Sequence, residues 1–285
     1  MLYLPQNIPA SLELHTVTYK LDEWETVLGC KRVLLLNLMP QKAVTEYDIA
    51  RVLQLTDKDI QLIPIKISGQ QYKNTSKIHM DSFYLNFEEV ENSMFDRLII
   101  TGAPLEQIDF EDVRYWDALC YIMEWSDQHV KRNLYICWAA QAGLYHFYNL
   151  PKYRLEQKMF GVFLQQVNYP QNPLMRNLGV EFPMPNSRHT EIRKEDVESY
   201  LSSELQIIAE SQESGVGVLA TLDLKRTFIV GHLEYAADTL HKEYWRDINK
   251  GLSINPPLHY YGKENSLQFS WKQVAISFYT NWIND

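Results

Sequence analysis

The sequence predicts an α/β protein in which a mainly parallel sheet is flanked by helices. The first observation is a series of short, uninterrupted apolar runs, which suit strands that are covered on both faces. The second is that segments between these runs carry apolar residues at helical spacing. Strands that alternate with helices form βαβ units, and these units build parallel sheets.

Each expected strand is one of these short apolar runs. The second run contains Pro64, which has no backbone N–H to donate, so it suggests an edge strand or a short strand. In chain order the runs occupy residues 33–36, 60–65, 98–101, 134–137, 207–209, 216–219 and 228–230.

The expected helices follow the same order. Residues 45–54 place Ile49, Val52 and Leu53 on one side of a helix. Residues 110–130 form a second, strongly apolar helical pattern, and residues 238–249 form a third with charges spread through it. Ligands of such sheets bind beyond the carboxyl ends of the strands, so residues just after strands are the first candidates for a site.

Length and composition indicate one compact domain. The 285 residues include 46% hydrophobic and 13% aromatic residues, which excludes intrinsic disorder. No repeat or flexible linker is visible, so a single domain is expected over residues 1–285, with a short N-terminal extension at 1–30. The net charge of -9 argues against a nucleic-acid partner, although a local basic pocket for one anionic ligand remains compatible with it.

The chain carries the features expected of a cytoplasmic protein. Its first residues lack a basic segment followed by a long apolar run, so no secretory signal and no membrane span are expected. The cysteines Cys30, Cys120 and Cys137 are sparse and form no C-x-x-C pair, which fits a reducing compartment. Metal-ligand patterns are absent from the sequence, so no metal site is expected.

Cys137 is the first candidate for chemistry, because it closes an expected strand just before a helix start. The positive end of a helix favours a thiolate, and the free amides there, notably that of Trp138, can hold an oxyanion. The pattern resembles a nucleophile elbow, with Ala139 as the small residue after the cysteine but Tyr135 where a glycine often stands. A buried structural thiol fits the local sequence equally well.

His232 also follows an expected strand, and Glu234 stands two residues later. A carboxylate at that spacing orients an imidazole and stabilises its protonated form, which is the role of the third member of a catalytic triad. The motif is weak by itself, since the chain has eight histidines. Its position at the carboxyl end of a strand, like that of Cys137, strengthens it.

Two cations have possible binding roles. Lys42 follows the first strand, although the local sequence favours a solvated loop lysine over a binding role. Arg246 lies in the last expected helix. There it either binds the carboxylate of a ligand through two hydrogen bonds or pairs with Glu243 or Asp247. Spacing alone assigns no role to Lys158 or to Ser187.

Several blocks of the sequence resemble the homoserine O-acyltransferase family, also called homoserine trans-succinylases. The first block is N-L-M-P-Q-K at residues 37–42 with Thr45 and Glu46 after it. The blocks run in family order from about residue 31 to 283, and together they are highly specific. The others lie at residues 100–104, 110–116, 136–142, 187–191, 231–235 and 280–282.

This resemblance implies a flavodoxin-like fold similar to class I glutamine amidotransferases, and an enzyme that acylates the side-chain hydroxyl of homoserine from an acyl-CoA. It implies ping-pong kinetics, no permanently bound cofactor and a homodimer. Carried over to this chain, the resemblance makes Cys137 the acyl-thioester nucleophile, His232 the general base and Glu234 its partner. Lys42 and Trp138 would serve the oxyanion or acyl group, and Lys158, Ser187 and Arg246 would bind the substrate, with Arg246 on its carboxylate.

The resemblance also bears on the acyl donor through Glu106. In this family a small residue at that position goes with succinyl donors, and Glu goes with acetyl donors. The physical reason is that a nearby carboxylate repels the terminal carboxylate of a succinyl group. Acetyl-CoA is therefore the expected co-substrate, unless Glu106 is a loop residue that points to solvent.

The acceptor is left open between L-homoserine and L-serine. The chain departs from the family pattern at Asn186, Leu233, Ala236 and residues 271–273, around the acceptor positions. Serine lacks one methylene of homoserine, and one methylene contributes only about 1–3 kcal/mol of discrimination. The expected role is therefore in methionine or cysteine biosynthesis.

Three alternatives remain at this stage. One keeps the reaction but uses succinyl-CoA with homoserine. Another is a glutaminase-like cysteine hydrolase, which would release ammonia from glutamine without CoA. The third is a binding module without turnover, although the retained Cys137, His232 and Glu234 argue against it.

Overall fold

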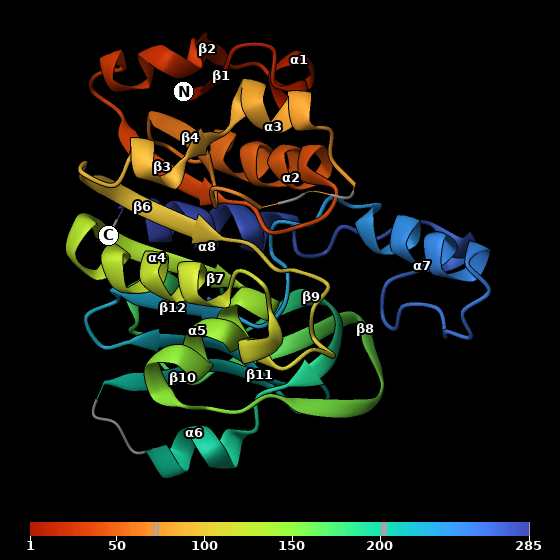
Figure 1. The fold of residues 1–285 in the computed structure, drawn as a ribbon. Coiled ribbons are helices and arrows are strands. Elements are labelled where there is room, and N and C mark those ends of the chain that lie inside the picture. Colours follow the sequence, from red (N-terminus) through yellow and green to blue (C-terminus); the bar gives the residue numbers. More distant parts are fainter. Residues whose placement is uncertain (71, 73, 201–203, 285) are drawn as a thin grey trace.

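The computed structural model describes residues 1–70, 72, 74–200 and 204–284, and the strands of this part form one sheet (Figure 1). Its middle strands are the apolar runs expected from the sequence. From edge to edge the order is β2 (Val17–Tyr19), β1 (Leu2–Pro5), β4 (Ile60–Lys66), β3 (Lys31–Leu36), β6 (Phe95–Ile100), β7 (Val130–Ile136), β12 (Arg226–Ile229), β11 (Gly215–Thr221), β10 (Leu205–Ser211), β8 (Tyr153–Val167) and β9 (Glu181–Glu191), with β5 (Leu85–Asn86) on β4.

The sheet is parallel from β2 to β12 and antiparallel from β12 to β9. The mainly parallel α/β architecture predicted from the sequence is therefore confirmed. The antiparallel half was not predicted. It contains the long β8–β9 hairpin, whose apolar run at residues 159–164 was not recognised as a strand from the sequence.

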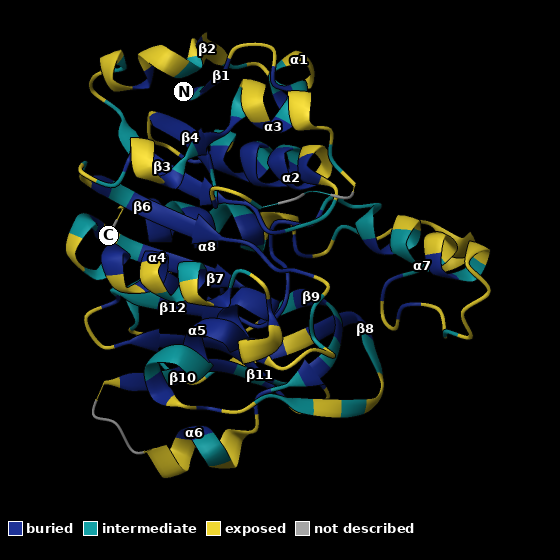
Figure 2. Ribbon diagram, viewed as in Figure 1, coloured by how far each residue is buried: buried dark blue, intermediate teal, exposed yellow. Residues whose placement is uncertain are grey.

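Helices cover both faces of the sheet. Alternate residues of β3 enter different cores: Val33 and Leu35 pack on one face, and Leu34 and Leu36 pack on the other. The first core is closed by α2 (Lys42–Gln54) and α8 (Lys272–Asn284), and the second by α4 (Trp116–His129) and α5 (Trp138–Tyr148). Figure 2 shows the buried residues concentrated in these central layers.

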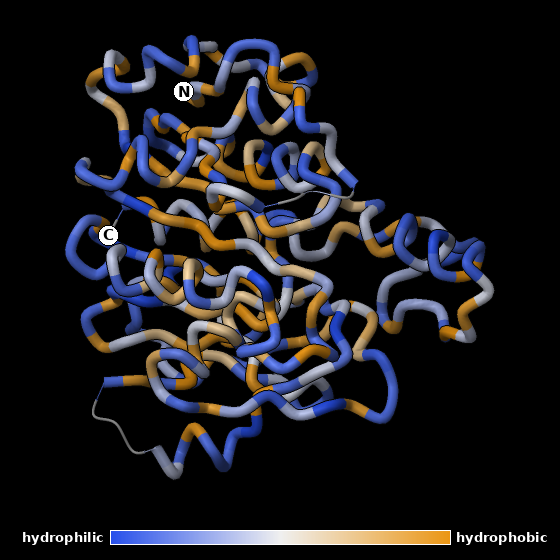
Figure 3. Tube along the Cα trace, viewed as in Figure 1, coloured by the Kyte–Doolittle hydropathy of each residue, from blue (hydrophilic) through white to orange (hydrophobic). Residues whose placement is uncertain are grey.

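The remaining helices lie nearer the surface. Figure 1 shows α7 (Thr239–Asn249) projecting away from the sheet, and Figure 3 shows that α7 carries many hydrophilic residues. The shorter helices are α1 (Pro9–Glu13), α3 (Lys77–Phe83) and α6 (Lys194–Tyr200), and the 3-10 turns are η1 (Leu21–Thr26), η2 (Phe87–Glu89), η3 (Phe110–Asp112), η4 (Pro173–Met175) and η5 (Lys263–Asn265). Among the described residues, no helix has the length and apolar character needed to cross a membrane.

The strand that contains Pro64 is neither an edge strand nor a short strand, whereas the sequence had suggested one or the other. Its strand, β4, has seven residues and has neighbours on both sides. Pairing with β1 involves only Ile60 and Gln61, and pairing with β5 begins at Ile65, so Pro64 falls between these two short neighbours. A proline is tolerated there because the register pairs it with β3 on the other side alone.

The first thirty residues belong to the sheet and the core, although the sequence suggested a separate N-terminal extension. Strand β1 pairs in parallel with both β4 and β2, and Leu2 and Leu4 are buried in the core. This segment therefore adds two strands to the sheet rather than lying outside it.

Candidate active site

Cys137 lies in a sharp turn between β7 and α5, at the carboxyl end of the parallel strands. Its φ of 55° and ψ of -114° are unusual for a residue with a side chain, and its backbone N–H donates to Ile229 O at 2.7 Å. The neighbouring loop after β6 comes close at Gly102, where a Cβ would stand 3.2 Å from Cys137 Cβ. This strained, closely packed turn is the geometry of a nucleophile elbow.

His232 and Glu234 lie beside this thiol. The His232 ring bonds to Glu234 Oε1 through Nδ1 at 2.6 Å, and a hydrogen bond links the ring to the Cys137 side chain. Burial by itself would lower the pKa of His232, but the negative charges of Cys137 and Glu234 outweigh it and raise that pKa well above its usual value. The three side chains therefore form a hydrogen-bonded Cys137–His232–Glu234 arrangement.

Further side chains contact the residues of this triad. Arg51 Nη2 donates to the backbone oxygen of Glu234 at 2.8 Å, and the Tyr235 ring stacks on His232 with centroids 4.0 Å apart. Asp48 is buried on α2, where burial and the charge of Glu234 raise its pKa to about 8. Asp48 was not predicted from the sequence, because a helix pattern does not show which strand end it faces.

Lys42 is a buried residue rather than the solvated loop lysine that was the alternative. Its Nζ donates to Asn37 O at 2.6 Å and to Met39 O at 2.8 Å, which holds the amine at the start of α2. Burial lowers the pKa of Lys42 to about 8, against the opposing influence of Glu46. An ammonium group has three N–H donors, so one remains after these two bonds.

Trp138 opens α5 directly after the cysteine. Its backbone N–H belongs to the first turn of the helix, where the amides have no acceptor within the helix. Its position therefore fits the predicted oxyanion role, while its indole ring is buried in the core.

The three predicted substrate-binding residues meet in one charged network at the base of α7. Ser187 Oγ donates to Glu243 Oε2 at 2.5 Å, and Lys158 Nζ lies 3.2 Å from Asp247 Oδ2 and 3.8 Å from Glu243. Arg246 Nε bonds to Asp247 at 2.8 Å, which is the intrahelical pairing considered from the sequence. Tyr235 joins this network to the triad, because its hydroxyl donates to Glu243 at 3.1 Å.

Glu106 is not a fully exposed loop residue, and it lines a cavity together with Lys152, Arg154 and Thr190. It is half-buried in the loop after β6, and burial raises its pKa while His189, His232 and Lys158 oppose the rise. The charges of the triad and of the substrate-binding network therefore act on this carboxylate.

Sequence reasoning gave no role in the site to three charged residues besides Asp48, although it named Glu243 and Asp247 as possible partners of Arg246. Glu243 and Asp247 are four residues apart on α7, a spacing that puts them on one face and could have indicated a shared role. Arg188 is fully buried, donates to Thr190 O and Ser214 O, and has its pKa lowered to about 10 by burial against the charge of Cys137. In the described part of the chain, no group of acidic, histidine or cysteine side chains is placed to hold a metal ion.

Comparison with known sequences gives consistent relatives. The profile of the family described as "Homoserine O-succinyltransferase" matches residues 24–285. A "Homoserine O-acetyltransferase" of Parabacteroides distasonis is 46% identical over 256 residues, which cover 89% of this chain and 82% of the relative. Proteins with the same name from Brevibacillus brevis and Methanomethylophilus alvi are 43% and 44% identical, and each match covers at least 88% of this chain and 82% of the relative.

Comparison with solved structures concerns the fold. A glutamine amidotransferase of Thermotoga maritima superposes with a TM-score of 0.60 at 13% identity, covering 90% of this chain and all of the other. A glutamine amidotransferase of Methylobacillus flagellatus gives 0.58 at 13% identity, covering 90% and 95%. The predicted class I glutamine amidotransferase-like fold is therefore confirmed.

Proposed function

The chain belongs to the homoserine O-succinyltransferase family, and from this premise we propose that it transfers an acetyl group from acetyl-CoA to the side-chain hydroxyl of L-homoserine. The observation that carries the proposal is the buried Cys137–His232–Glu234 arrangement at the elbow after β7. The reaction belongs to methionine biosynthesis.

In the first half-reaction the Cys137 thiolate attacks the carbonyl carbon of the thioester and forms a new C–S bond. The Trp138 amide and the free N–H of Lys42 stabilise the oxyanion, which is the largest electrostatic contribution in acyl transfer. The C–S bond to CoA then breaks, and the departing sulfur takes the proton of the His232 imidazolium. The products are acetyl-Cys137, neutral His232 and free CoA.

In the second half-reaction the neutral His232 removes the proton of the acceptor hydroxyl. The acceptor oxygen attacks the acetyl carbon, and the Cys137 thiolate leaves with the bonding pair. The proton stays on His232, so the thiolate–imidazolium pair is restored. Covalent catalysis of this kind gives ping-pong kinetics.

The charges around Ser187 support an amino-acid acceptor. Lys158 and Arg246 provide cations for its carboxylate, and Glu243 provides an anion for its ammonium group. Because Tyr235 connects Glu243 to the ring of His232, the bound hydroxyl would lie near the general base.

Glu106 supports acetyl-CoA as the donor. Its carboxylate interacts electrostatically with His232 and Lys158, and it would repel the free carboxylate of a succinyl group but not an acetyl methyl. The donor is therefore acetyl-CoA, although the family carries the succinyl name.

We choose homoserine over serine because two departures that raised the serine alternative, Asn186 and Leu233, lie in the core. Asn186 is buried and bonds to Met184 O and to the Arg188 side chain, and Leu233 is fully buried. Neither side chain takes part in the Ser187–Glu243–Lys158 network. We further propose a homodimer that acts in the cytoplasm without a permanent cofactor, and the subunit number can be measured by analytical ultracentrifugation.

The test is CoA release by the purified protein, with acetyl-CoA and succinyl-CoA each crossed with L-homoserine and L-serine. We expect acetyl transfer to homoserine, and acetyl-Cys137 should be detected by mass spectrometry when the acceptor is omitted. Cys137→Ala should lose both signals by at least about 1,000-fold in rate. Transfer by the Cys137→Ala variant, or ammonia release from glutamine in place of acyl transfer, would contradict the proposal.

A further inference from the structure

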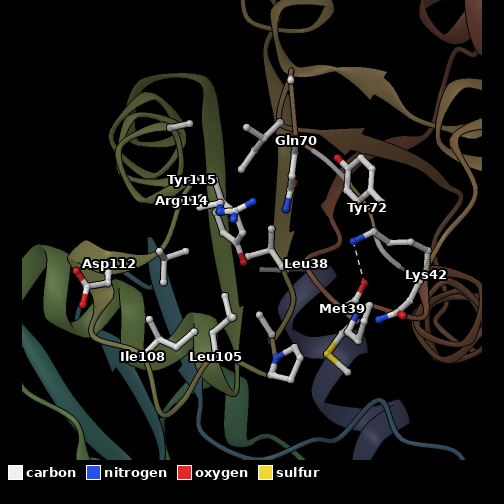
Figure 4. A pocket seen from close by; sticks show the side chains of 18 of the residues that line it. Leu38, Met39, Lys42, Gln70, Tyr72, Leu105, Ile108, Asp112, Arg114 and Tyr115 are labelled. Carbon is white, nitrogen blue, oxygen red and sulfur yellow. Dashed lines mark hydrogen bonds between the residues drawn. The ribbon is translucent and has the colours of Figure 1, made fainter.

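A cavity of about 730 Å³ lies at the carboxyl ends of β3, β4 and β6, and neither the triad nor the acceptor network accounts for it. Its walls come from the loops after these strands and from the start of α4, as Figure 4 shows. Lys158, Ser187 and Arg246 are not among the described residues that line it. The cavity therefore approaches the site from a different side than the acceptor network.

The cavity begins next to the nucleophile. Ala103 lines it and directly follows Gly102, where a Cβ would lie only 3.7 Å from Cys137 Sγ. Lys42 also lines it, and its ammonium group keeps one N–H donor after its two bonds to backbone oxygens. A molecule in this cavity would therefore lie beside the loop after β6 that packs against Cys137.

The wall of the cavity combines apolar and polar side chains, which suits a long ligand with both kinds of group. Leu38, Ile67 and Leu105 supply apolar surface, and Gln70 and Asn74 supply amide groups that both donate and accept hydrogen bonds. The arm of an acyl-CoA alternates methylene groups with amides in the same way. The volume is also within the range of 300–1,000 Å³ that is typical of cofactor-sized ligands.

Arg114 provides a cation at this cavity. Figure 4 shows its guanidinium group beside Tyr115, pointing toward the amide of Gln70 on the opposite wall. Asp112 is the one carboxylate among the described lining residues, and its carboxylate points away from Arg114 in Figure 4. A planar guanidinium group without an acidic partner in the described part of the chain is suited to bidentate binding of phosphate.

We propose that this cavity binds the CoA portion of the donor, with the thioester at Cys137 and the phosphate groups on Arg114. The assignment rests on the proposed acetyl-CoA reaction and identifies where its donor enters. Donor and acceptor then reach Cys137 from two different sides.

A neighbouring cavity of about 560 Å³ shares Gly69, Gln70 and Tyr72 with the first and contains Lys66 and Lys77. Lys66 is already paired with Asp81 at 2.7 Å, and Lys77 faces the same carboxylate. Their charge is therefore partly neutralised, which favours Arg114 as the phosphate ligand and makes Lys77 a matched control.

The experiment compares acetyl-CoA with S-acetyl-pantetheine, which carries the same arm without phosphates, in steady-state kinetics with homoserine. We expect Arg114→Ala to raise the KM for acetyl-CoA about tenfold or more, because charged hydrogen bonds to phosphate are lost. The KM for homoserine, and kcat/KM for S-acetyl-pantetheine, should stay at the wild-type values. Lys77→Ala should behave like the wild type with both donors.

A second variant tests the position of the arm. Leu105→Trp narrows the cavity, so it should lower kcat/KM for both donors alike, with the thermal midpoint measured to confirm folding. Equal kinetics of Arg114→Ala and the wild type, a selective loss in Lys77→Ala, or normal donor use by Leu105→Trp would overturn the assignment. Wild-type protein that forms no acetyl-Cys137 from either donor would instead contradict the proposed function itself.

Discussion

At the scale of single residues, Cys137 shows how one strained position organises the candidate site. Its positive φ directs the side chain out of the turn, while its backbone N–H remains bonded to Ile229. A conformation of this kind costs on the order of 1–3 kcal/mol and persists only where the surroundings fix it. Here the surroundings are the ends of β6, β7 and β12, and these same strand ends bring His232 to the thiol.

Lys42 provides a test of the oxyanion role through pH. Because burial lowers its pKa to about 8, the amine is charged below that pH and loses its charge as the pH rises through it. Activity that depends on the ammonium group should therefore fall between about pH 7 and 9. Lys42→Met should lower kcat/KM for acetyl-CoA about 100-fold and abolish this part of the pH profile. The measurement is kcat/KM for acetyl-CoA from pH 6 to pH 10.

The same profile separates Lys42 from His232. If Lys42→Met lowers activity but keeps the falling limb near pH 8, that limb belongs to another group, such as the His232 imidazolium. Circular dichroism of the variant controls for folding, since Lys42 is buried.

Glu106 is expected to select the donor by charge. Glu106→Gln and Glu106→Ala should both raise kcat/KM for succinyl-CoA, by about tenfold or more, because the repulsion between two carboxylates is removed. Acetyl-CoA should be used almost as before. Crossed kinetics with the two donors measure the change. A gain in Glu106→Ala without any gain in Glu106→Gln would identify side-chain volume, rather than charge, as the determinant.

At the scale of elements, the β8–β9 hairpin depends on a close contact that its sequence does not reveal. Gly161 in β8 has a φ of +150°, and a Cβ there would stand 2.4 Å from Leu258 O and 2.7 Å from Leu258 N. These are backbone atoms of the segment that follows α7, so neither partner can move aside easily. The glycine thus fixes how the hairpin meets that segment.

Gly161→Ala should therefore destabilise the fold by about 3 kcal/mol or more, from overlap and strain together. Gly215→Ala is the matched control, because Gly215 also has a positive φ, of +71°, but no atom within 4 Å of the added Cβ. The control should lose only about 1 kcal/mol. Urea unfolding of both variants measures the difference, and equal losses would show that the contact with Leu258 contributes nothing.

At the scale of the whole molecule, the central sheet is tied to its last helix by a buried cation. Arg97 in β6 donates from Nε to Trp282 O at 2.8 Å and from Nη2 to Ile283 O at 2.7 Å. These oxygens belong to the last turn of α8, where carbonyl groups lack partners within the helix. The arginine therefore stabilises a helix end that lies far from it in the sequence.

Arg97→Met should lower the free energy of unfolding by about 3 kcal/mol, because two buried carbonyl groups lose their donors. Arg32→Met removes an exposed bond to Glu25 O and should have an effect of less than about 1 kcal/mol. Chemical denaturation followed by tryptophan fluorescence measures both. If the two variants were equally stable, α8 would not depend on Arg97.

The sequence by itself determined the α/β class, the central strands and the residues that stand at their carboxyl ends. Continuous apolar runs reveal strands covered on both faces, and Cys137, Lys42 and His232 could be placed because each stands at the end of such a run or a few residues after it. These features are local, since a strand and the turn that ends it are encoded within a few neighbouring residues.

Only the tertiary structure decided the antiparallel half of the sheet, the integration of β1 and β2, and the surroundings of the triad. Asp48, Arg188 and Glu243 come from α2, β9 and α7, and each reaches the site through packing between segments far apart in the chain. The cavity beside Cys137 is likewise formed by loops after three different strands. Such features arise from long-range contacts, and a periodic pattern along one segment carries no information about the partner that it meets.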